Sequence, residues 1–328
     1  MTGQNGRVPL TRIARATPQD NTPLSAGSVV TIGAYDGLHL GHQEVLRLVR
    51  DLADARGLDA VAVTFDRHPA QVVRPDSAPL SLTTLEQKLE LLVGAELLDL
   101  VCVLPFDRAR SEETASDFVN SVLVGLLGAR MVVVGADFHF GHKREGNVSF
   151  LERLGADLGF EVLGLGLIAP ETDPLHVPYS STNVRTALVA GDVEGAALLL
   201  GRLHEVRGMV VVGDRRGREL GFPTANIALP IDTCLPADGI YAGHFRGSDG
   251  DWRGCVISLG RRPTFYEEGA ELLLEAYLLD FDGDLYGQEV AVRFLTKIRD
   301  QERFESTEAL IEAINSDCDQ ARFALSRP

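Results

Sequence analysis

The sequence predicts an α/β fold in two parts, a Rossmann-like parallel sheet followed by a small antiparallel β-barrel and a C-terminal helix. A chain of 328 residues is long enough for two domains. In the first part, short β-branched runs alternate with segments of helical period, which is typical of a parallel sheet covered by helices. In the second part, runs of period two follow one another across tight turns, which is typical of a barrel. We expect an N-terminal flexible arm (1–24), an α/β domain (25–190), a linker (191–204) and a barrel domain (205–328).

The predicted elements follow one another in a regular order. Strands of the first part are expected at 29–32, 59–66, 98–103, 130–134 and 161–167. Helix starts there are marked by a Thr83–Glu86 capping box, by Ser116 and by Asn147. The segment 66–79 holds three prolines and no period, so we expect a loop. The barrel should contain five or six strands, and Ser306 should cap a last helix over 307–323.

Charge and cysteine content exclude several classes of protein. The formal net charge of −16 disfavours non-specific binding to DNA, RNA or anionic membranes. The first ten residues lack the apolar core of a signal peptide, and no apolar run is long enough to cross a membrane. The four cysteines form no C-x-x-C pair and are typical of reduced cytosolic thiols: Cys102, Cys234, Cys255 and Cys318. We therefore expect a cytoplasmic protein.

The turn from Gly33 to His42, here called the histidine turn, is predicted to bind phosphate. Its glycines, including Gly37 and Gly41, let the backbone approach a ligand closely, and a helix begins at Gly41. Backbone N–H groups and the helix dipole at such a place favour an anion. His39 and His42 follow the pattern H-x-G-H, so both rings can act on the same charge. The turn is neither a Walker loop nor a G-x-G-x-x-G fingerprint.

Two further segments carry groups suited to phosphate. The turn G-A-D-F-H-F-G-H (135–142) follows the fourth strand, so it should lie near the histidine turn at the carboxyl edge of the sheet. In Y-S-S-T-N-V-R (179–185), Ser180 or Ser181 can cap a helix, and Thr182 lies in its first turn. Arg185 follows one turn later and supplies a forked cation. We expect these groups to hold phosphate oxygens.

The barrel half contains a string with the features of a second phosphate site, residues 213–226. Its three glycines make the backbone approachable, as a phosphate-wrapping flap requires: Gly213, Gly217 and Gly221. Pro223 fixes the chain before Thr224, whose hydroxyl lies two residues from the Asn226 carboxamide. In an extended chain both side chains face the same way, and their oxygens suit Mg²⁺.

Both halves resemble one known family. The string G-A-Y-D-G-L-H-L-G-H is similar to the signature of the H-x-G-H nucleotidyltransferases. The string 213–226 resembles the riboflavin kinase signature that ends in P-T-A-N, and G-R-R-P-T-F (260–265), F-D-G-D-L-Y-G (281–287) and K-I-R (297–299) match later kinase segments. From Val29 to Phe323 the chain therefore resembles the bacterial bifunctional riboflavin kinase/FAD synthetases.

The resemblance implies two ATP-dependent steps and a role for named residues. The C-terminal domain would phosphorylate riboflavin to FMN, with Glu275 as general base and Mg²⁺ on Thr224 and Asn226. The N-terminal nucleotidyltransferase domain would join FMN to the α-phosphate of a second ATP, giving FAD and pyrophosphate. The residues implied in catalysis there are His39, His42 and Arg185. Those implied in binding ATP or its phosphates are Gly33, Asp36, Gly41, Asp137, Ser180, Ser181 and Thr182, and in the kinase Gly213, Gly217, Gly221 and Pro223. Those implied in binding flavin are Phe65, His68, Pro69 and Arg299.

Three departures from the family pattern bear on the N-terminal half. Tyr35 replaces the more common Phe, Arg67 replaces a Pro beside the flavin loop, and Ala136 replaces an acidic residue. They leave an alternative open, a riboflavin kinase whose weakened N-terminal half only binds nucleotide or FMN as a sensor or scaffold. A nucleotidyltransferase for another phosphate acceptor is disfavoured, because such an enzyme has no use for the P-T-A-N segment.

The implied ligands are small molecules. We expect Mg²⁺, with ATP as co-substrate, and riboflavin, FMN, FAD and ADP as further ligands. We expect neither nucleic acid nor a membrane as partner, and the resemblance leaves room for a homo-oligomer.

Overall fold

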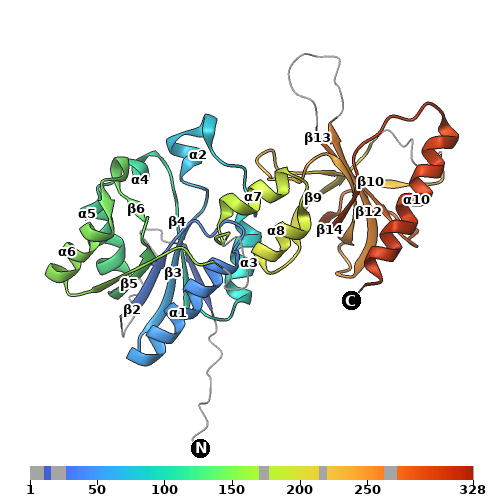
Figure 1. The fold of residues 1–328 in the computed structure, drawn as a ribbon. Helices are drawn as coiled ribbons and strands as arrows, with labels where there is room; N and C mark the ends of the chain where they lie inside the picture. Colours follow the sequence, from blue (N-terminus) through green and yellow to red (C-terminus); the bar gives the residue numbers. More distant parts are fainter. Residues whose placement is uncertain (1–10, 16–26, 170–176, 214–219, 262–271, 328) are drawn as a thin grey trace, which may run out of the picture. The chain divides into compact units, whose positions relative to one another are not determined.

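The structure is a computed structural model, and it describes residues 11–15, 27–169, 177–213, 220–261 and 272–327 (Figure 1). The chain forms two compact units, which divide between Ser181 and Thr182. This division lies ahead of the predicted linker 191–204. That segment contains helix α8 (Val193–Leu200), which packs on strands of the second unit. Among the described residues, no helix combines the length and apolar character needed to cross a membrane.

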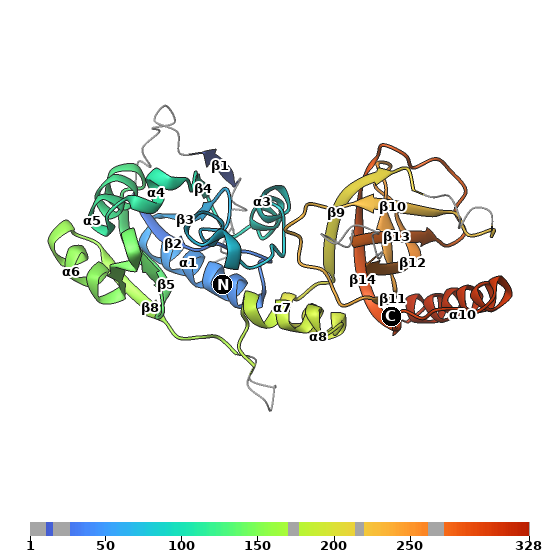
Figure 2. The same ribbon diagram turned by 90° about the horizontal axis from the view of Figure 1, so that it is seen from above.

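The first unit is built on a six-stranded parallel sheet with the strand order β1-β4-β3-β2-β5-β8 (Figure 2). Its strands are β1 (Arg12–Arg15), β2 (Ser28–Ile32), β3 (Asp59–Phe65), β4 (Leu100–Leu104), β5 (Ala129–Gly135) and β8 (Glu161–Leu165). Every residue of β2 and β4 is buried, as expected for parallel strands covered on both faces. The Rossmann-like fold class predicted from the alternating pattern is confirmed.

Helices cover both faces of this sheet. One face packs against α1 (Leu40–Arg56) and α3 (Leu85–Gly94), which contribute Leu46, Val49 and Leu92 to the core. The other face packs against α5 (Ala115–Phe118), the π-helical η2 (Val119–Leu126) and α6 (Val148–Leu158). The smaller elements are α2 (Ala70–Val73), η1 (Pro75–Ser77), α4 (Arg108–Glu112), β6 (His139–Phe140), η3 (His142–Arg144) and β7 (Gly146–Asn147).

Part of the predicted N-terminal arm is a strand. Residues Arg12–Arg15 form β1, which pairs in parallel with β4 at the edge of the sheet. The Thr11 hydroxyl adds a hydrogen bond of 2.7 Å to the Leu98 carbonyl. The prediction of a flexible arm over 1–24 is thus wrong for these residues, because the backbone of β4 supplies them with partners about 90 residues away in the chain.

Two predicted helix starts and one predicted loop also needed correction. The capping box of α3 is formed by Thr84 and Gln87, one residue after the predicted pair Thr83 and Glu86. Thr114 caps α5 in place of Ser116. The predicted loop 66–79 contains the short helices α2 and η1. The caps predicted at Asn147 and Ser306 are confirmed.

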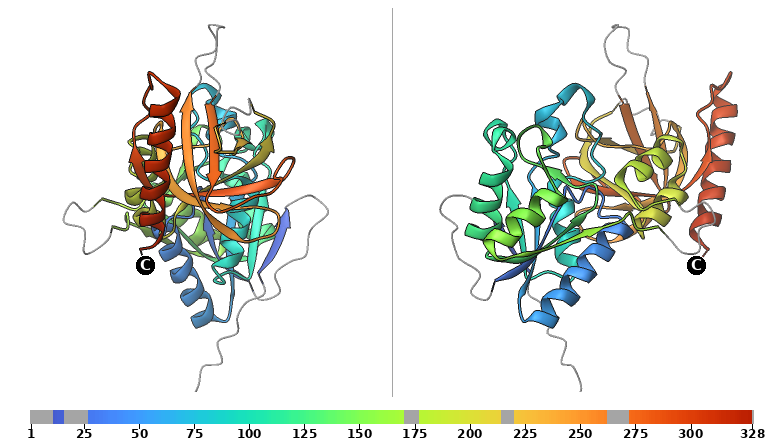
Figure 3. Two further views of the ribbon diagram at one scale, coloured as in Figure 1. Left: turned by 90° about the vertical axis from the view of Figure 1, so that its right-hand side faces the viewer. Right: turned by 60° about the vertical axis from the view of Figure 1, so that its left-hand side comes forward.

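The second unit is a closed six-stranded antiparallel barrel in the order β10-β13-β12-β11-β14-β9. Its strands are β9 (His204–Val211), β10 (Thr224–Ala228), β11 (Gly239–Arg246), β12 (Trp252–Arg261), β13 (Leu272–Leu278) and β14 (Glu289–Arg299). Figure 3 shows α10 (Thr307–Leu325), drawn in red, running along the barrel. Cys318 and Ala321 of α10 pack on Ile240, Ala242 and Val256. Helix α7 (Ser181–Val189) begins at the boundary between the units.

Candidate active sites

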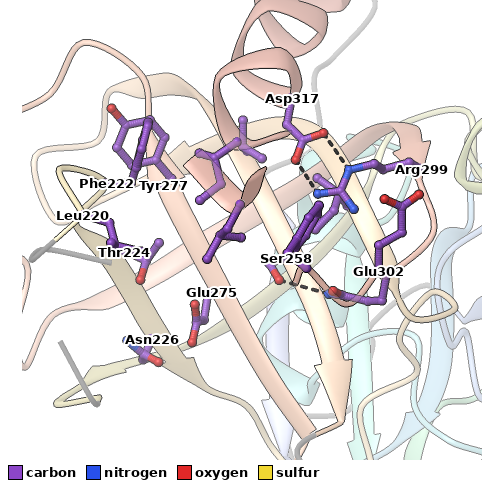
Figure 4. Close-up of a pocket in the computed structure, with 16 residues that line it drawn as sticks. Leu220, Phe222, Thr224, Asn226, Ser258, Glu275, Tyr277, Arg299, Glu302 and Asp317 are labelled. Atoms are coloured by element: carbon purple, nitrogen blue, oxygen red, sulfur yellow. Dashed lines mark hydrogen bonds and ion pairs between the residues drawn. The ribbon is translucent and has the colours of Figure 1, made fainter. Parts of the chain in front are cut away.

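A cavity of about 310 Å³ lies on the outer face of the barrel, between its strands and α10 (Figure 4). Apolar side chains from the barrel and from α10, such as Ile240, Val256 and Ile314, line much of it. Thr224, Asn226 and Glu275 lie on one side of it, and Arg299, Glu302 and Asp317 on the other (Figure 4). Ser258 of β12 lies between the two sides, where its hydroxyl accepts a 3.1 Å hydrogen bond from Gln301 Nε2. A mostly apolar cavity of this size with convergent polar groups is typical of a small-molecule site.

Strand register brings three polar side chains of the cavity into one row. Asn226 of β10 is paired with Glu275 of β13, and Glu275 is paired with Ser258 of β12. Thr224 and Tyr277 form the next pair on the same face, because alternate residues of a strand point the same way. All five side chains line the cavity (Figure 4). Thr224, Asn226 and Glu275 were predicted as site residues from the sequence, whereas Ser258 and Tyr277 were not.

The Asn226 carboxamide has an unsatisfied oxygen. Asn226 is 6% exposed, and its Oδ1 is buried without a hydrogen-bond partner among the described residues. Leaving a buried acceptor unpaired costs about 1–3 kcal/mol. Gly213 lies directly over this group, since an ideal Cβ at that position would come within 2.6 Å of Oδ1. The Asn226 carboxamide can therefore occupy this space only because Gly213 has no side chain.

The rest of the predicted kinase residues lie in or near this cavity. Arg299 lines it and donates two hydrogen bonds of 2.7 and 2.8 Å to the buried Asp317 carboxylate of α10. Gly221 takes a positive φ of 89°, and Pro223 directly precedes β10. Gly217 lies outside the described residues.

In the first unit, the histidine turn connects β2 to α1. His39 is the N-cap of α1, and its Nδ1 accepts a hydrogen bond of 3.3 Å from the His42 backbone N–H. A backbone N–H can only donate, so Nδ1 accepts this bond and the ring carries its N–H donor at Nε2. The two rings are stacked with their centroids 3.6 Å apart. The prediction that both histidines belong to one turn at a helix start is confirmed.

The His42 ring is held in the neutral form. Its Nδ1 is buried and has no hydrogen-bond partner among the described residues. Burial, and then the neighbouring His39, lower the pKa of His42 well below its ordinary value. The Tyr35 ring meets His42 edge to face at 5.0 Å, and its hydroxyl lies 2.7 Å from the Thr31 hydroxyl. Both rings can therefore donate hydrogen bonds to an oxyanion here, and His42 can do so without adding a fixed charge.

Three other predicted residues of this turn make structural contacts. The Asp36 carboxylate accepts hydrogen bonds from the Leu82 N–H and from the N–H and hydroxyl of Thr83. Gly33 donates its N–H to the Val63 carbonyl. At Gly41, an ideal Cβ would lie 2.9 Å from the Tyr179 Cβ, so this glycine lets the segment before α7 pack on α1. A carboxylate that binds N–H groups in this way holds the loop at 82–83.

The remaining predicted residues of the N-terminal half lie in three places. The Ser181 hydroxyl donates a 2.8 Å hydrogen bond to the Asp36 carbonyl, which fixes the first residue of α7 at the histidine turn. Ser180 precedes it, and Thr182 and Arg185 follow on α7. Phe65 is the last residue of β3. Pro69 is the N-cap of α2, and the His68 Nδ1 accepts a hydrogen bond from the N–H of the first residue of that helix. Asp137 is exposed on the loop after β5.

Comparison with known proteins matches each unit to a different family profile. The profile of FAD synthetase matches residues 21–177, and the profile of riboflavin kinase matches residues 200–325. The bifunctional riboflavin kinase/FMN adenylyltransferase of Pseudomonas fluorescens is 40% identical over 306 residues, which cover 93% of this chain and 95% of that protein. The chain belongs to the family of bifunctional riboflavin kinase/FMN adenylyltransferases.

Another family member and one solved structure match this chain over almost their whole length. The Escherichia coli K12 enzyme of the same description is 36% identical, covering 92% of this chain and 95% of that protein. A crystal structure described as a macrolide-efflux protein from Streptococcus pneumoniae superposes with a TM-score of 0.78 at 30% identity, covering 95% of this chain and 99% of that one. As a riboflavin kinase/FMN adenylyltransferase, the protein makes FAD from riboflavin in two steps with ATP as co-substrate, and the kinase-only alternative is not favoured.

One residue of the adenylyltransferase half escaped the sequence analysis. Lys88 of α3 is 7% exposed, and its Nζ donates hydrogen bonds to the Ala34 carbonyl at 3.2 Å and the Phe65 carbonyl at 2.7 Å. The sequence feature that could have identified it is its position in α3. Lys88 lies at helical spacing from Leu85 and Leu92, within the apolar stripe of the helix. A charged residue on the core side of a helix calls for partners at its tip.

Proposed function

We propose that the barrel cavity is the riboflavin kinase site and that Glu275 is its general base. The single observation that supports this most is the row of Asn226, Glu275 and Ser258, which runs across three adjacent strands and lines the cavity. In the proposed step, the 5′-oxygen of riboflavin bonds to the γ-phosphorus of ATP, and the bond to the ADP oxygen breaks. The hydroxyl proton passes to the Glu275 carboxylate. A general base of this kind typically contributes about 10²–10⁴ in rate.

The proposed flavin pose follows from the polar groups on the two sides of the cavity. The ring system lies on the apolar lining, against Val256 and Ile314, so that the ribityl chain reaches Glu275. Arg299 then contacts the far edge of the ring. Its guanidinium is held by the buried Asp317 carboxylate, so its direction is fixed before the flavin binds.

Thr224 and Asn226 are proposed to hold Mg²⁺ for this step. The fit rests on the chemistry of the donors, since a hydroxyl and a carboxamide oxygen are ligands that Mg²⁺ accepts, and on the buried Oδ1 of Asn226, which lacks a partner among the described residues. When bound, the ion would neutralise charge on the ATP phosphates. Gly213 and Gly221 let the chain before β10 approach those phosphates, and Gly217 is proposed to do the same.

The histidine turn is proposed to be the FMN adenylyltransferase site. An oxygen of the FMN phosphate bonds to the α-phosphorus of ATP, and the bond to pyrophosphate breaks, so the protein supplies positioning and charge stabilisation only. His39 and His42 donate hydrogen bonds to the phosphate oxygens, which would also satisfy the buried His42 Nδ1. Ser180, Ser181, Thr182 and Arg185 at the start of α7 bind the triphosphate, since Ser181 is tied to the turn. Phe65, His68, Pro69 and Asp137 are proposed to contact the FMN or the adenosine.

The remaining proposals concern the setting of the enzyme. Its ligands are small flavins and adenine nucleotides with Mg²⁺, and a net charge of −16 disfavours nucleic acid or an anionic membrane as partner. We place it in the cytoplasm, where its four buried free cysteines stay reduced.

The test is to incubate the pure protein with riboflavin and MgATP and to resolve riboflavin, FMN and FAD by chromatography. We expect FMN to appear first and FAD to follow. Removal of Mg²⁺ with a chelator should stop FMN formation. FMN that accumulates without FAD while ATP is in excess would support the kinase-only alternative, and unchanged riboflavin would contradict the assignment of the barrel.

A further inference from the structure

A buried lysine joins two loops at the carboxyl edge of the first unit's sheet. The Lys88 ammonium donates to the Ala34 and Phe65 carbonyls, at 3.2 and 2.7 Å. Ala34 is the second residue of the histidine turn, and Phe65 is the last residue of β3, directly before the 66–69 loop. The Thr64 hydroxyl also donates to the Ala34 carbonyl at 3.2 Å, so β3 reaches the turn from a second position.

The charges around Lys88 come from the same two loops. The negative groups that act on its ammonium are Asp36 of the histidine turn and Asp66 at the start of the 66–69 loop. Asp66 is in turn held by the Phe106 N–H at 2.8 Å, and Asp36 by the loop at 82–83. The histidine turn therefore supplies one carbonyl and one carboxylate, and the end of β3 with the first residue of the 66–69 loop supplies another such pair. Lys88 is the cation between them.

A lysine that only stabilised the fold would not need this position. Burial of an ammonium is unfavourable unless its donors are satisfied, and an apolar side chain would continue the stripe of Leu85 and Leu92 at no such cost. A tip that contacts both substrate loops has a different consequence. It holds the Ala34 and Phe65 carbonyls close to each other, because both accept a hydrogen bond from the same ammonium.

We propose that Lys88 is a positioning residue for adenylyl transfer, whose ammonium clamps the histidine turn to the 66–69 loop. The proposal rests on the proposed adenylyltransferase function of the histidine turn. The turn carries the groups that bind phosphate, and the 66–69 loop carries those that bind FMN. Their relative placement therefore decides whether the FMN oxygen faces the α-phosphorus of ATP.

The test measures FAD formation from supplied FMN and MgATP by Lys88→Met, which keeps the length and volume of the side chain. Misplacement of reacting groups by about 1 Å can cost about 10² in rate, so we expect a loss of that order in kcat at pH 7. FMN formation from riboflavin, measured in the same sample, should stay within twofold of wild type. The matched control is Glu86→Gln, an exposed charge on the same helix, which should leave both rates unchanged.

A pH profile separates positioning by the charge from support of the fold. Burial lowers the pKa of Lys88 to about 8, although Asp36 and Asp66 oppose the shift. The wild-type rate of FAD formation should fall as the pH rises through about 8 and the ammonium loses its charge. Carboxylates do not titrate in this range. The residual rate of Lys88→Met should be flat, and Lys88→Arg should keep its rate above pH 8.

Each outcome bears on the proposal. Lys88→Met with a rate within threefold of wild type, or a pH profile shared by both proteins, would overturn it. So would variants that lose FAD formation only in proportion to the fraction unfolded in a thermal melt. A wild-type protein that makes FMN but no FAD would instead contradict the adenylyltransferase assignment itself.

Discussion

Substitution of Gly213 by alanine should disable the kinase through Asn226. The added Cβ would lie 2.6 Å from the Asn226 Oδ1 and closer still to its Cγ and Nδ2, whereas ordinary contacts begin at 3.4 Å. Moving its nearest atoms from 2.4 Å to 3.4 Å requires the carboxamide to shift by about 1.0 Å, or the backbone at Gly213 to move by as much. A displacement of about 1 Å in a reacting geometry can cost about 10² in rate.

The assay is FMN formation as a function of Mg²⁺ concentration at saturating riboflavin. We expect Gly213→Ala to need more Mg²⁺ for half-maximal rate and to lose about 10² in kcat, while it still converts supplied FMN to FAD. Gly247→Ala is the control, because a Cβ there would meet its nearest neighbour at 3.4 Å. A Gly213→Ala protein with the wild-type rate and Mg²⁺ dependence would refute the reasoning that Asn226 acts from this position.

Three further predictions follow from the two sites. Glu275→Ala should lose about 10²–10⁴ in the rate of FMN formation and keep FAD formation from FMN. Glu289→Ala, which removes an exposed carboxylate, should keep both activities. If Glu275→Ala forms FMN as fast as wild type, the base lies elsewhere. His39→Ala and His42→Ala should each lose about 10²–10³ in FAD formation with FMN formation intact, and normal FAD formation by either would remove the histidine turn from the mechanism. Burial lowers the pKa of His204 to about 4, so the barrel should lose stability as the pH falls from about 6.5 towards 4, by about 3 kcal/mol in all. The stability is fully present above pH 6.5, where folded and unfolded forms are both neutral. Chemical unfolding at several pH values should show this slope, and His204→Gln should flatten it.

Most of the fold and the outline of both sites could be predicted from short stretches of the sequence. The strand before the histidine turn and the helix after it could be read from a few adjacent residues, since glycine, β-branched residues and a change of period act over short distances. The same holds for Thr224 and Asn226, whose common direction follows from the alternation of a strand.

The features that escaped prediction depend on partners far away in the chain. Thr83 is not the helix cap, because its N–H and hydroxyl bind Asp36, which lies 47 residues earlier in the chain. The next threonine, Thr84, caps the helix instead. Strand β1 exists because β4 offers it an edge. Asp36 looked like a phosphate ligand within its motif, and only the fold shows that its carboxylate holds the loop at 82–83.

The closure of the barrel has a consequence for how the chain acquires its two activities during synthesis. The first strand, β9, pairs with β10 beside it and with β14, and β14 also pairs with β11. Until residues 289–299 have left the ribosome, β9 and β11 each keep an open edge, and the cavity lacks Arg299 and the whole of α10. The sheet of the first unit needs nothing beyond residue 165. The nascent chain thus completes the sheet that carries the second reaction of the pathway well before it can form the barrel for the first.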